Sequence, residues 1–302
     1  MPKRFLTYII LVSILFLIVF IFKGQERSWQ ELVEKKNSIE SALVQKPFLH
    51  PDPARFSIPV PMLGSMVVLA KELGSNEDFI SYNADLRWPI ASITKLMSGL
   101  VASQIYSSSS EITISESAVA VEGIAGGLKA GEIYTMQDVL KILFAVSSND
   151  AALSLAEGYG VDRFIATMNA QAKQLHMTET VFTDPSGLSL YNQSTARDLE
   201  KLIQFLAYMN PELLAITRES EVEITEKTST LKRKLVAINQ FAGSEEFLGG
   251  KTGFTDEASG NLVSLFRLHD RPFLIIVFGT DDRFGETARI RDWLIKQLTT
   301  DN

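Results

Sequence analysis

Residues 5–22 form an apolar run without a charged side chain, preceded by Lys3 and Arg4 and followed by Lys23. A run of about 18 residues is at the lower end of the length that crosses a bilayer as a helix. It is longer than the apolar core of a cleaved signal peptide, and no small-residue cleavage site follows it. The pattern therefore predicts a transmembrane signal anchor, with a cleaved signal peptide as the alternative.

The charges beside this run predict where the rest of the chain works. Lys3, Arg4 and the free amino terminus favour a cytoplasmic N-terminus, so everything after Lys23 is expected on the extracytoplasmic side of the cell membrane. Near-helical apolar spacing in 25–46 predicts a spacer helix, and prolines between 47 and 61 mark the entry to a globular part. We expect three parts: a cytoplasmic tip and single-pass anchor in 1–23, a helical stalk and Pro-rich linker in 24–54, and one domain in 55–302.

Within the globular part, the apolar spacing changes from strand-like to helix-like and back. Two apolar runs around a turn predict a β-hairpin, and helical spacing after Pro89 puts Ser92 in the first turn of a helix. Strands at both ends with helices between them predict an α+β domain with one sheet, whose edges are distant in sequence, and a helical insertion over about 108–218. The expected strands are 64–70, 78–82, 262–268 and 273–279, and the further helices are 139–157 with a possible break around Ser147, 161–175, 194–208 and 284–298.

The composition of the chain argues against several classes of function. The 302 residues carry a net charge of -7, which argues against a nucleic-acid surface, because neutralising phosphates needs clustered Lys and Arg. Cysteine is absent, so a disulfide framework and a thiolate zinc site are excluded. The three histidines are far apart in sequence and form no His-Glu-x-x-His motif, so we expect each to have a structural role.

Three short motifs occur in one order: Ser92-Ile-Thr-Lys95, then Ser147-Ser-Asn149, then Lys251-Thr-Gly253. Ser-x-x-Lys and Ser-x-Asn each occur elsewhere in the chain, but only this set has all three in that order. Together they can build a serine nucleophile that is activated by lysine. Each motif alone also has a structural interpretation: a helix cap, a helix kink and a turn.

The chemistry of the first motif follows from helix geometry. Residues three apart lie on one helix face, so Lys95 can approach the Ser92 hydroxyl. Lysine becomes a base only if burial and a nearby positive group lower its pKa, and Lys251 is the candidate positive group. The Ser92 backbone N–H at a helix start is a candidate oxyanion-hole donor.

The other two motifs can complete such a site. The Ser147 hydroxyl can pass a proton to a leaving amine, and the Asn149 amide can orient Lys95 and bind a substrate carbonyl. Gly253 removes a side chain from a strand edge, so an extended peptide could pair there. Lys251 and Thr252 would then hold its carboxylate.

On these residues the chain resembles the serine D-alanyl-D-alanine carboxypeptidases of peptidase family S11, which are low-molecular-mass penicillin-binding proteins. The resemblance covers about 64–294 and extends beyond the three motifs to Gly127–Glu132, Phe182–Leu188 and Ser194–Leu199. It implies a β-lactamase/transpeptidase-like fold. It also implies peptidoglycan stem peptides as substrate and β-lactams as inhibitors that acylate the same serine, and it implies no metal and no organic cofactor.

The resemblance implies a role for each matching position. Ser92 is acylated and Lys95 deprotonates it, while Ser147 and Asn149 assist proton transfer and substrate placement. The terminal carboxylate is bound by Lys251 and Thr252, beside Gly253. The oxyanion hole is formed by the backbone N–H groups of Ser92 and Phe254.

The residues leave three neighbouring functions open. A class A β-lactamase would add a glutamate base, but 149–251 has no Glu-x-x-Leu-Asn. A catalytically silent wall-binding protein could use the same fold, and an endopeptidase that cuts cross-links is a closer variant. Many relatives have an arginine near the final helix, where this chain offers Arg283 and Arg289.

Overall fold

The computed structural model describes residues 56–123 and 125–300, which lie within one compact unit. The expected membrane segment 5–22 and the expected stalk helix 25–46 lie outside the described residues. Among the residues described, no helix combines the length and the apolar character needed to cross a bilayer.

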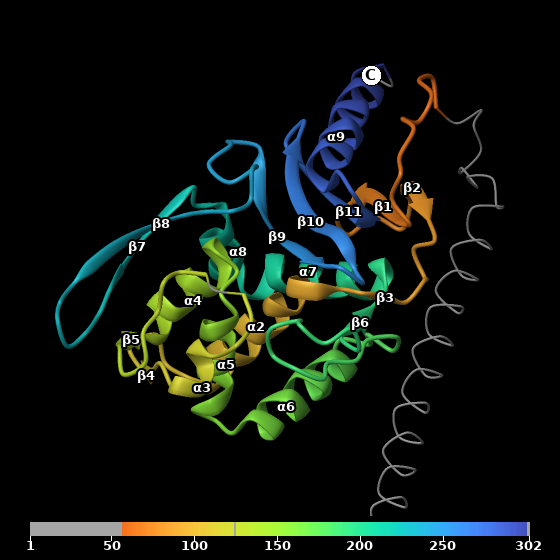
Figure 1. The fold of residues 1–302 in the computed structure, drawn as a ribbon. Coiled ribbons are helices and arrows are strands. Elements are labelled where there is room, and N and C mark those ends of the chain that lie inside the picture. The colour runs from red at the N-terminus through yellow and green to blue at the C-terminus, as the bar shows by residue number, and fades with distance from the viewer. Residues whose placement is uncertain (1–55, 124, 301–302) are drawn as a thin grey trace, which may run out of the picture. The chain divides into compact units, whose positions relative to one another are not determined.

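A five-stranded antiparallel sheet forms the centre of the domain, in the order β2-β1-β11-β10-β9 (Figure 1). The two N-terminal strands pair as the expected hairpin, and β1 also pairs with β11, more than 200 residues later in the chain. The sheet therefore joins the two ends of the domain. Its strands are β1 (Val67–Glu72), β2 (Asp78–Tyr82), β9 (Phe247–Thr255), β10 (Ser259–Leu268) and β11 (Arg271–Thr280).

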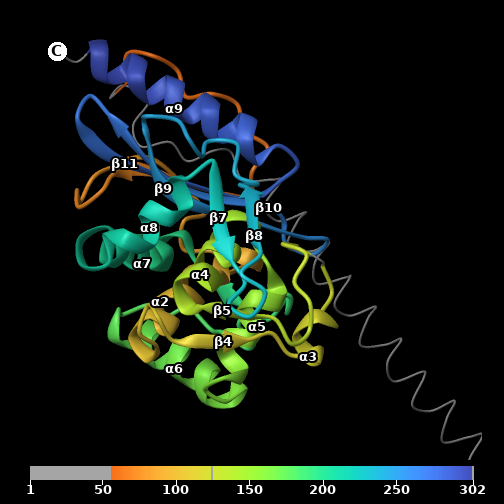
Figure 2. The same ribbon diagram turned by 90° about the vertical axis from the view of Figure 1, so that its left-hand side faces the viewer.

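Both faces of the sheet are buried. Alternate residues of β1 show this directly, because Val67 and Leu69 join the core beneath the sheet whereas Val68 and Ala70 join the core above it. The upper core is closed by α9 (Arg283–Thr300), which lies along the sheet in Figure 2. A strand buried on both faces reads as a continuous apolar run, which is why the sequence predicted this strand without alternation.

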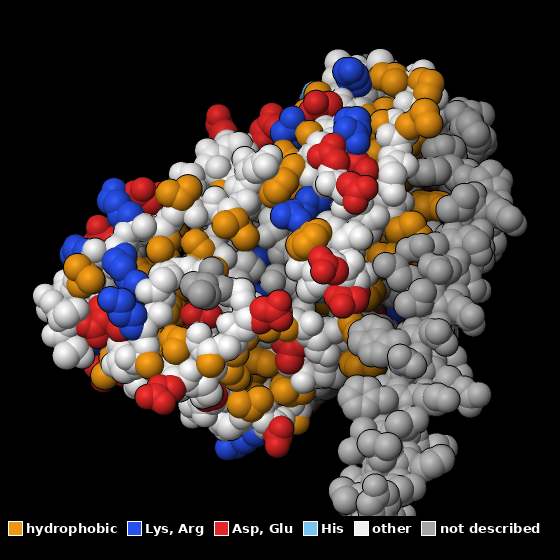
Figure 3. Space-filling model, viewed as in Figure 1, with side chains coloured by type: hydrophobic (Ala, Val, Ile, Leu, Met, Phe, Trp, Pro, Cys, Tyr) orange, Lys and Arg blue, Asp and Glu red, His pale blue; other side chains and the backbone are white. Residues whose placement is uncertain are grey.

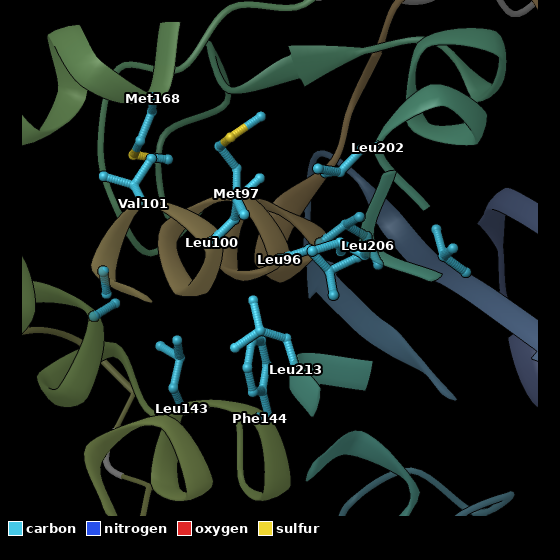
Figure 4. Close-up of a cluster of buried hydrophobic side chains, with 14 of the residues drawn as sticks. Leu96, Met97, Leu100, Val101, Leu143, Phe144, Met168, Leu202, Leu206 and Leu213 are labelled. Carbon is cyan, nitrogen blue, oxygen red and sulfur yellow. The ribbon is translucent and has the colours of Figure 1, made fainter. Parts of the chain in front are cut away.

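The other face of the sheet carries the helices between β3 and β7. At their centre lies α2, whose Leu96, Met97 and Leu100 pack among side chains from α4, α6, α7 and α8, including Phe144 (Figure 4). The helices here are α2 (Lys95–Ile105), α3 (Glu116–Val119), α4 (Met136–Ala145), α5 (Asn149–Glu157), α6 (Val161–Gln174), α7 (Ala196–Met209) and α8 (Pro211–Arg218).

Three two-stranded sheets complete the described fold, and the sequence did not predict them. They are β3 (Trp88–Pro89) with β6 (Gln193–Ser194), β4 (Glu111–Thr113) with β5 (Ile133–Thr135), and β7 (Glu221–Thr225) with β8 (Lys232–Val236). The β7–β8 hairpin alternates acidic and basic side chains on its exposed face, with Lys232 bound to Glu223 and Lys234 to Glu221. Figure 3 accordingly shows both charge signs side by side over this hairpin.

Buried charged groups tie separate elements together. The Glu286 carboxylate, on α9, accepts hydrogen bonds from the backbone N–H groups of Gly64 and Ser65, each at 3.1 Å, and from Thr280 Oγ1 at 2.6 Å. Lys71 of β1 is 4% exposed and lies 2.7 Å from the Glu200 carboxylate of α7. These contacts fix α9 and the helical region against the sheet.

Candidate active site

The segment that carries Ser92 is held against the sheet by side-chain hydrogen bonds to its backbone and flanks. Asn261 Nδ2, on β10, donates to the Pro89 carbonyl at 2.8 Å, and Trp88 Nε1 donates to the Ala258 carbonyl at 2.9 Å. Ser92 itself lies in a 3-10 helix, Ala91–Thr94, and α2 begins only at Lys95. The structure thus inserts a tighter turn where the sequence predicted the first turn of an α-helix.

Two glycines bring other segments into contact with the residues just before Ser92. A Cβ on Gly187 would lie 2.0 Å from the Ala91 carbonyl oxygen, and one on Gly253 would lie 2.8 Å from the Ile90 carbonyl oxygen. Ala91 has a φ of 47°, a left-handed conformation that costs a non-glycine residue free energy. Residues 88–94, the nucleophile segment, are therefore held in a strained conformation between two other backbone segments. This fixes the position of the Ser92 hydroxyl.

Lys95 lies fully buried beneath the Ser92 hydroxyl. Its Nζ is 2.9 Å from Ser92 Oγ, because side chains three residues apart eclipse in a 3-10 turn. The same Nζ donates to Asn149 Oδ1 at 2.6 Å and to the Ser186 carbonyl at 2.6 Å. Since Asn149 Nδ2 donates to the Glu122 carbonyl at 2.7 Å, the amide oxygen is the atom that faces the lysine.

Burial lowers the pKa of Lys95 to about 7, because the charged form loses its hydration. The carboxylates of Asp184 and Asp150 act in the opposite direction and raise the same pKa. The sequence named the charge on Lys251 as a second cause; the two lysine charges do repel each other, and this repulsion lowers the pKa of Lys251. A lysine at this value is about half neutral at pH 7 and can act as a general base.

The second motif lies where one helix ends and the next begins. α4 ends at Ala145, and Ser148 Oγ caps α5 by accepting from the Ala151 N–H at 3.1 Å. The expected break near Ser147 is therefore confirmed, and its cause is the cap. Ser147, with a φ of 60°, lies in the link between the two helices, and Asn149 is the first residue of α5.

The third motif lies on β9, which is the edge strand of the sheet. Lys251 is 2% exposed, and its Nζ donates to Ser147 Oγ at 2.8 Å and to the Thr252 carbonyl at 2.8 Å. Burial, together with the charges of Lys95 and Arg283, holds the pKa of Lys251 well below its usual range. One edge of β9 pairs with β10 and the other pairs with no described strand, so a substrate backbone could pair there, while the face of the strand at Gly253 contacts the nucleophile segment.

The structure distinguishes between the two arginines that the sequence offered. Arg283, at the start of α9, is half-buried, donates to the Gly253 carbonyl at 3.4 Å and leaves its Nε without an acceptor. Burial lowers the pKa of this guanidinium. Arg289 is 48% exposed and pairs with Asp282 at 3.3 Å. Arg283 is therefore the arginine beside the third motif.

All the sequence-predicted site residues fall in one region. Hydrogen bonds link Ser92, Lys95 and Asn149, and they link Ser147 with Lys251. Thr252 is buried beside Lys251, Gly253 contacts the nucleophile segment and Phe254 is 60% exposed at the end of the motif. Among the described residues, no cluster of three or more His, Cys, Asp or Glu could hold a metal ion.

Sequence reasoning missed the backbone acceptors of this site. The carbonyls of Ser186 and Glu122 bind the Lys95 amine and the Asn149 amide, respectively. A carbonyl group carries no residue signature, so only the surrounding motif could have pointed to it. Ser186 lies in the segment Phe182–Leu188, which the sequence singled out without a role.

Comparison with known proteins agrees with this geometry. The D-alanyl-D-alanine carboxypeptidase family, peptidase S11, matches residues 62–282. A D-alanyl-D-alanine endopeptidase from Escherichia coli is 33% identical over 243 residues, which is 78% of this chain and 78% of that protein. The family match therefore covers most of the chain, including all three motifs.

Solved structures show the same fold. A D-alanyl-D-alanine carboxypeptidase from Mycobacterium tuberculosis has a TM-score of 0.74 at 27% identity, over 82% of this chain and 96% of that one. Penicillin-binding protein D2 from Listeria monocytogenes, in its ampicillin-bound form, has a TM-score of 0.68 at 28% identity, over 78% of this chain and 99% of that one. The chain thus has the fold of the penicillin-binding proteins, and it belongs to the D-alanyl-D-alanine carboxypeptidase family of serine hydrolases.

Proposed function

We propose that this protein removes the terminal D-alanine from peptidoglycan stem peptides through an acyl-enzyme on Ser92. The observation that carries the proposal is the buried Lys95 amine, 2.9 Å from the Ser92 hydroxyl and with a pKa of about 7. A neutral amine at this distance accepts the hydroxyl proton as the oxygen attacks the peptide carbonyl. Family membership supports the same reaction.

The remaining groups have roles that follow from their contacts. The pair formed by Ser147 Oγ and Lys251 Nζ, 2.8 Å apart, can return a proton to the leaving amine. The hydrogen bond from Asn149 Nδ2 to the Glu122 carbonyl holds the amide in place beside Lys95, where it can bind a substrate carbonyl. We assign the oxyanion hole to the backbone N–H groups of Ser92 and Phe254, as in the family resemblance. Water then releases the acyl group.

Measurement of D-alanine release tests the proposal. The purified full-length chain is incubated with a pentapeptide that ends in D-Ala-D-Ala, and free D-alanine is quantified. We expect release from the wild type and none above background from Ser92→Ala or Lys95→Ala. Release by Ser92→Ala at the wild-type rate would overturn the assigned nucleophile.

Cleavage of cross-links is a second candidate, because the similar Escherichia coli protein is named an endopeptidase. A cross-linked peptide dimer and the linear pentapeptide, assayed side by side, separate the two activities by their ratio of kcat/KM. Labelling with fluorescent penicillin distinguishes the peptidase from a β-lactamase and from a silent wall-binding protein. A long-lived adduct on Ser92 supports the peptidase, fast turnover supports a β-lactamase, and no adduct supports a wall-binding protein without activity.

We propose that Arg283 binds the substrate's terminal carboxylate together with Lys251 and Thr252. Its Nε has no acceptor, and its charge contributes to lowering the pKa of Lys251, so it can offer a fork of donors beside the third motif. Arg283→Met should raise KM for the pentapeptide about 10- to 100-fold. The KM for a C-terminally amidated pentapeptide should change little, because that peptide has no terminal carboxylate. Arg289→Met is the matched control. Equal losses on the two peptides would contradict this role.

We also propose that residues 5–22 anchor the chain in the cell membrane, with the enzyme domain on the extracytoplasmic side. The support is the uncharged apolar run with basic residues before it. Membrane fractionation followed by protease treatment of spheroplasts tests it. We expect the domain to sediment with membranes and to be digested from outside. Recovery of an intact, protected domain would refute the orientation.

A further inference from the structure

The 183–189 loop touches the active site without containing any residue of the three motifs. Its Ser186 carbonyl accepts the hydrogen bond from Lys95 Nζ at 2.6 Å, and its Pro185 carbonyl accepts from Ser98 Oγ, one turn further along α2, at 2.5 Å. Two adjacent carbonyls therefore face the helix that carries the base. The loop supplies one of the three hydrogen-bond contacts that the Lys95 amine makes with described residues.

This contact matters because of the number of hydrogens on a neutral amine. Neutral lysine has two N–H donors and one lone pair, whereas Asn149 Oδ1 and the Ser186 carbonyl can only accept. If these two acceptors take the two N–H groups, the lone pair of Lys95 is left for the Ser92 hydroxyl. The Ser186 carbonyl thus orients the base, and its position determines whether the lone pair points at the nucleophile.

The position of that carbonyl is set by Asp184. Its Oδ1 accepts from the Ser186 N–H, from Ser186 Oγ and from the Gly187 N–H, each at 2.7 Å, and its Oδ2 accepts from the Ser189 N–H at 2.8 Å. Four donors on one carboxylate close the loop around it, as aspartate side chains do in turns. Two of these bonds come from the Ser186 and Gly187 N–H groups, which flank the Ser186 carbonyl and so set its direction.

Asn192 fastens the same loop to the nucleophile segment. This side chain is fully buried, and its Oδ1 accepts from the Thr183 N–H at 2.7 Å while its Nδ2 donates to Thr94 Oγ1 at 3.1 Å. On the other side of the loop, Gly187 lies against the Ala91 carbonyl. The loop is consequently rigid relative to Lys95.

Three charged groups face Lys95, each from a different element. Asp184 belongs to the 183–189 loop, Asp150 to α5 and Lys251 to β9. Asp150 is 2% exposed, and its Oδ1 has no hydrogen-bond partner, so it acts on Lys95 only through its charge. Asp184 differs, because it combines a charge with the bonds that shape the loop.

We propose that Asp184 is a positioning residue for the base: its carboxylate shapes the 183–189 loop so that the Ser186 carbonyl directs the Lys95 lone pair at Ser92, and its charge faces the same amine. The inference rests on the proposed role of Lys95 as general base. It adds a fourth segment to the three motifs of the site.

Asp184→Asn tests this role, because it keeps the size of the side chain and removes the charge. The assay is the rate of acylation of the full-length chain by fluorescent penicillin between pH 5 and 9. We expect the acidic limb of the profile to move to lower pH by about one unit, since a negative charge that raises the pKa of Lys95 has gone. We also expect the plateau rate to fall about tenfold, because the amide NH2 group cannot accept the Ser189 N–H bond, which weakens the loop that holds the carbonyl.

The matched control is Asp198→Asn. Asp198 is 2% exposed and also organises a turn, accepting from the Glu179 N–H at 2.8 Å and from Thr180 Oγ1 at 2.9 Å, but it does not shift the pKa of Lys95. It should lower thermal stability without moving the limb. A limb that stays in place in folded Asp184→Asn overturns the proposal.

A second variant covers the case in which Asp184→Asn does not fold. Ser186→Ala keeps the carbonyl and the Asp184 charge but removes the Ser186 Oγ bond to Asp184. We expect its plateau rate to fall severalfold with the limb in place, and an unchanged plateau would overturn the positioning role. If the wild type itself shows no acylation or no acidic limb, the failure lies with the proposed function instead.

Discussion

Changing the pH is the most direct perturbation of this site, because the proposed base must be neutral to act. An ordinary lysine with a pKa of 10.5 is neutral in about one molecule in 3,000 at pH 7. Burial lowers the pKa of Lys95 to about 7, so about half the molecules are neutral at that pH. The structure thus increases the fraction of active base by roughly three orders of magnitude.

The sign of the expected dependence follows from this value. Below about pH 6, each unit of acidification protonates Lys95 in about nine-tenths of the molecules still active, so the acylation rate should fall about tenfold per unit. Above about pH 8 nearly all the amine is neutral and the rate should level off. Because the Lys95 and Lys251 charges repel each other, the limb belongs to the pair of lysines.

The assay is the second-order rate constant for labelling of the purified full-length chain by fluorescent penicillin, at constant ionic strength from pH 5 to 9.5. The penicillin carboxylate stays ionised over this range, so the limb reports the protein. Ser92→Ala serves as the unlabelled control. A rate that keeps rising tenfold per unit to pH 9.5 would show a lysine of ordinary pKa and refute the reasoning, as would a flat rate from pH 5 to 8.

Three further predictions concern stability and packing. Gly187→Ala should lower the acylation rate at least 100-fold, because a Cβ at this φ of 89° would lie 2.0 Å from the Ala91 carbonyl oxygen. Labelling by fluorescent penicillin measures the rate, circular dichroism shows that the variant is folded, and a wild-type rate would contradict the prediction. Glu286→Gln should lower the free energy of unfolding by about 3 kcal/mol in urea titrations, because it removes the charge that several buried donors share, and a loss below 1 kcal/mol would contradict it. Lys71→Met should cost about 2 kcal/mol, because the partly buried Glu200 carboxylate loses its close partner and keeps only Arg197 at 3.8 Å. Adding Glu200→Gln should restore part of the loss, and no recovery would argue against the pair.

The β7–β8 hairpin and the arginine beside the third motif show where prediction from the sequence stopped. β7 is only five residues long and carries two apolar residues, Val222 and Ile224, while the two of β8, Leu235 and Val236, are adjacent and do not alternate. The arginine could not be chosen because Arg283 and Arg289 lie on the same helix, six residues apart. Only the packing of α9 against β10 and β11 turns Arg283 towards Gly253 and leaves Arg289 in solvent.

The sequence by itself determined the local features of this protein. The order of three motifs predicted seven of the eight site residues, and the family resemblance added Phe254. The apolar runs predicted the β1–β2 hairpin, β10, β11 and the longer helices, and the Ser-Ser-Asn run predicted the break between α4 and α5. These features depend on hydrogen bonds and side-chain periodicity within a few residues, which a single segment already contains.

Tertiary structure alone decided the chemistry of the base. The pKa of Lys95 depends on burial beneath segments that follow it by 50 to 160 residues, and on carboxylates that come from α5 and from the 183–189 loop. Hydration and charge interactions are set by neighbours in space, and no pattern along the chain records which neighbours those will be. The motifs therefore named the base, and the packing of the domain determined its protonation.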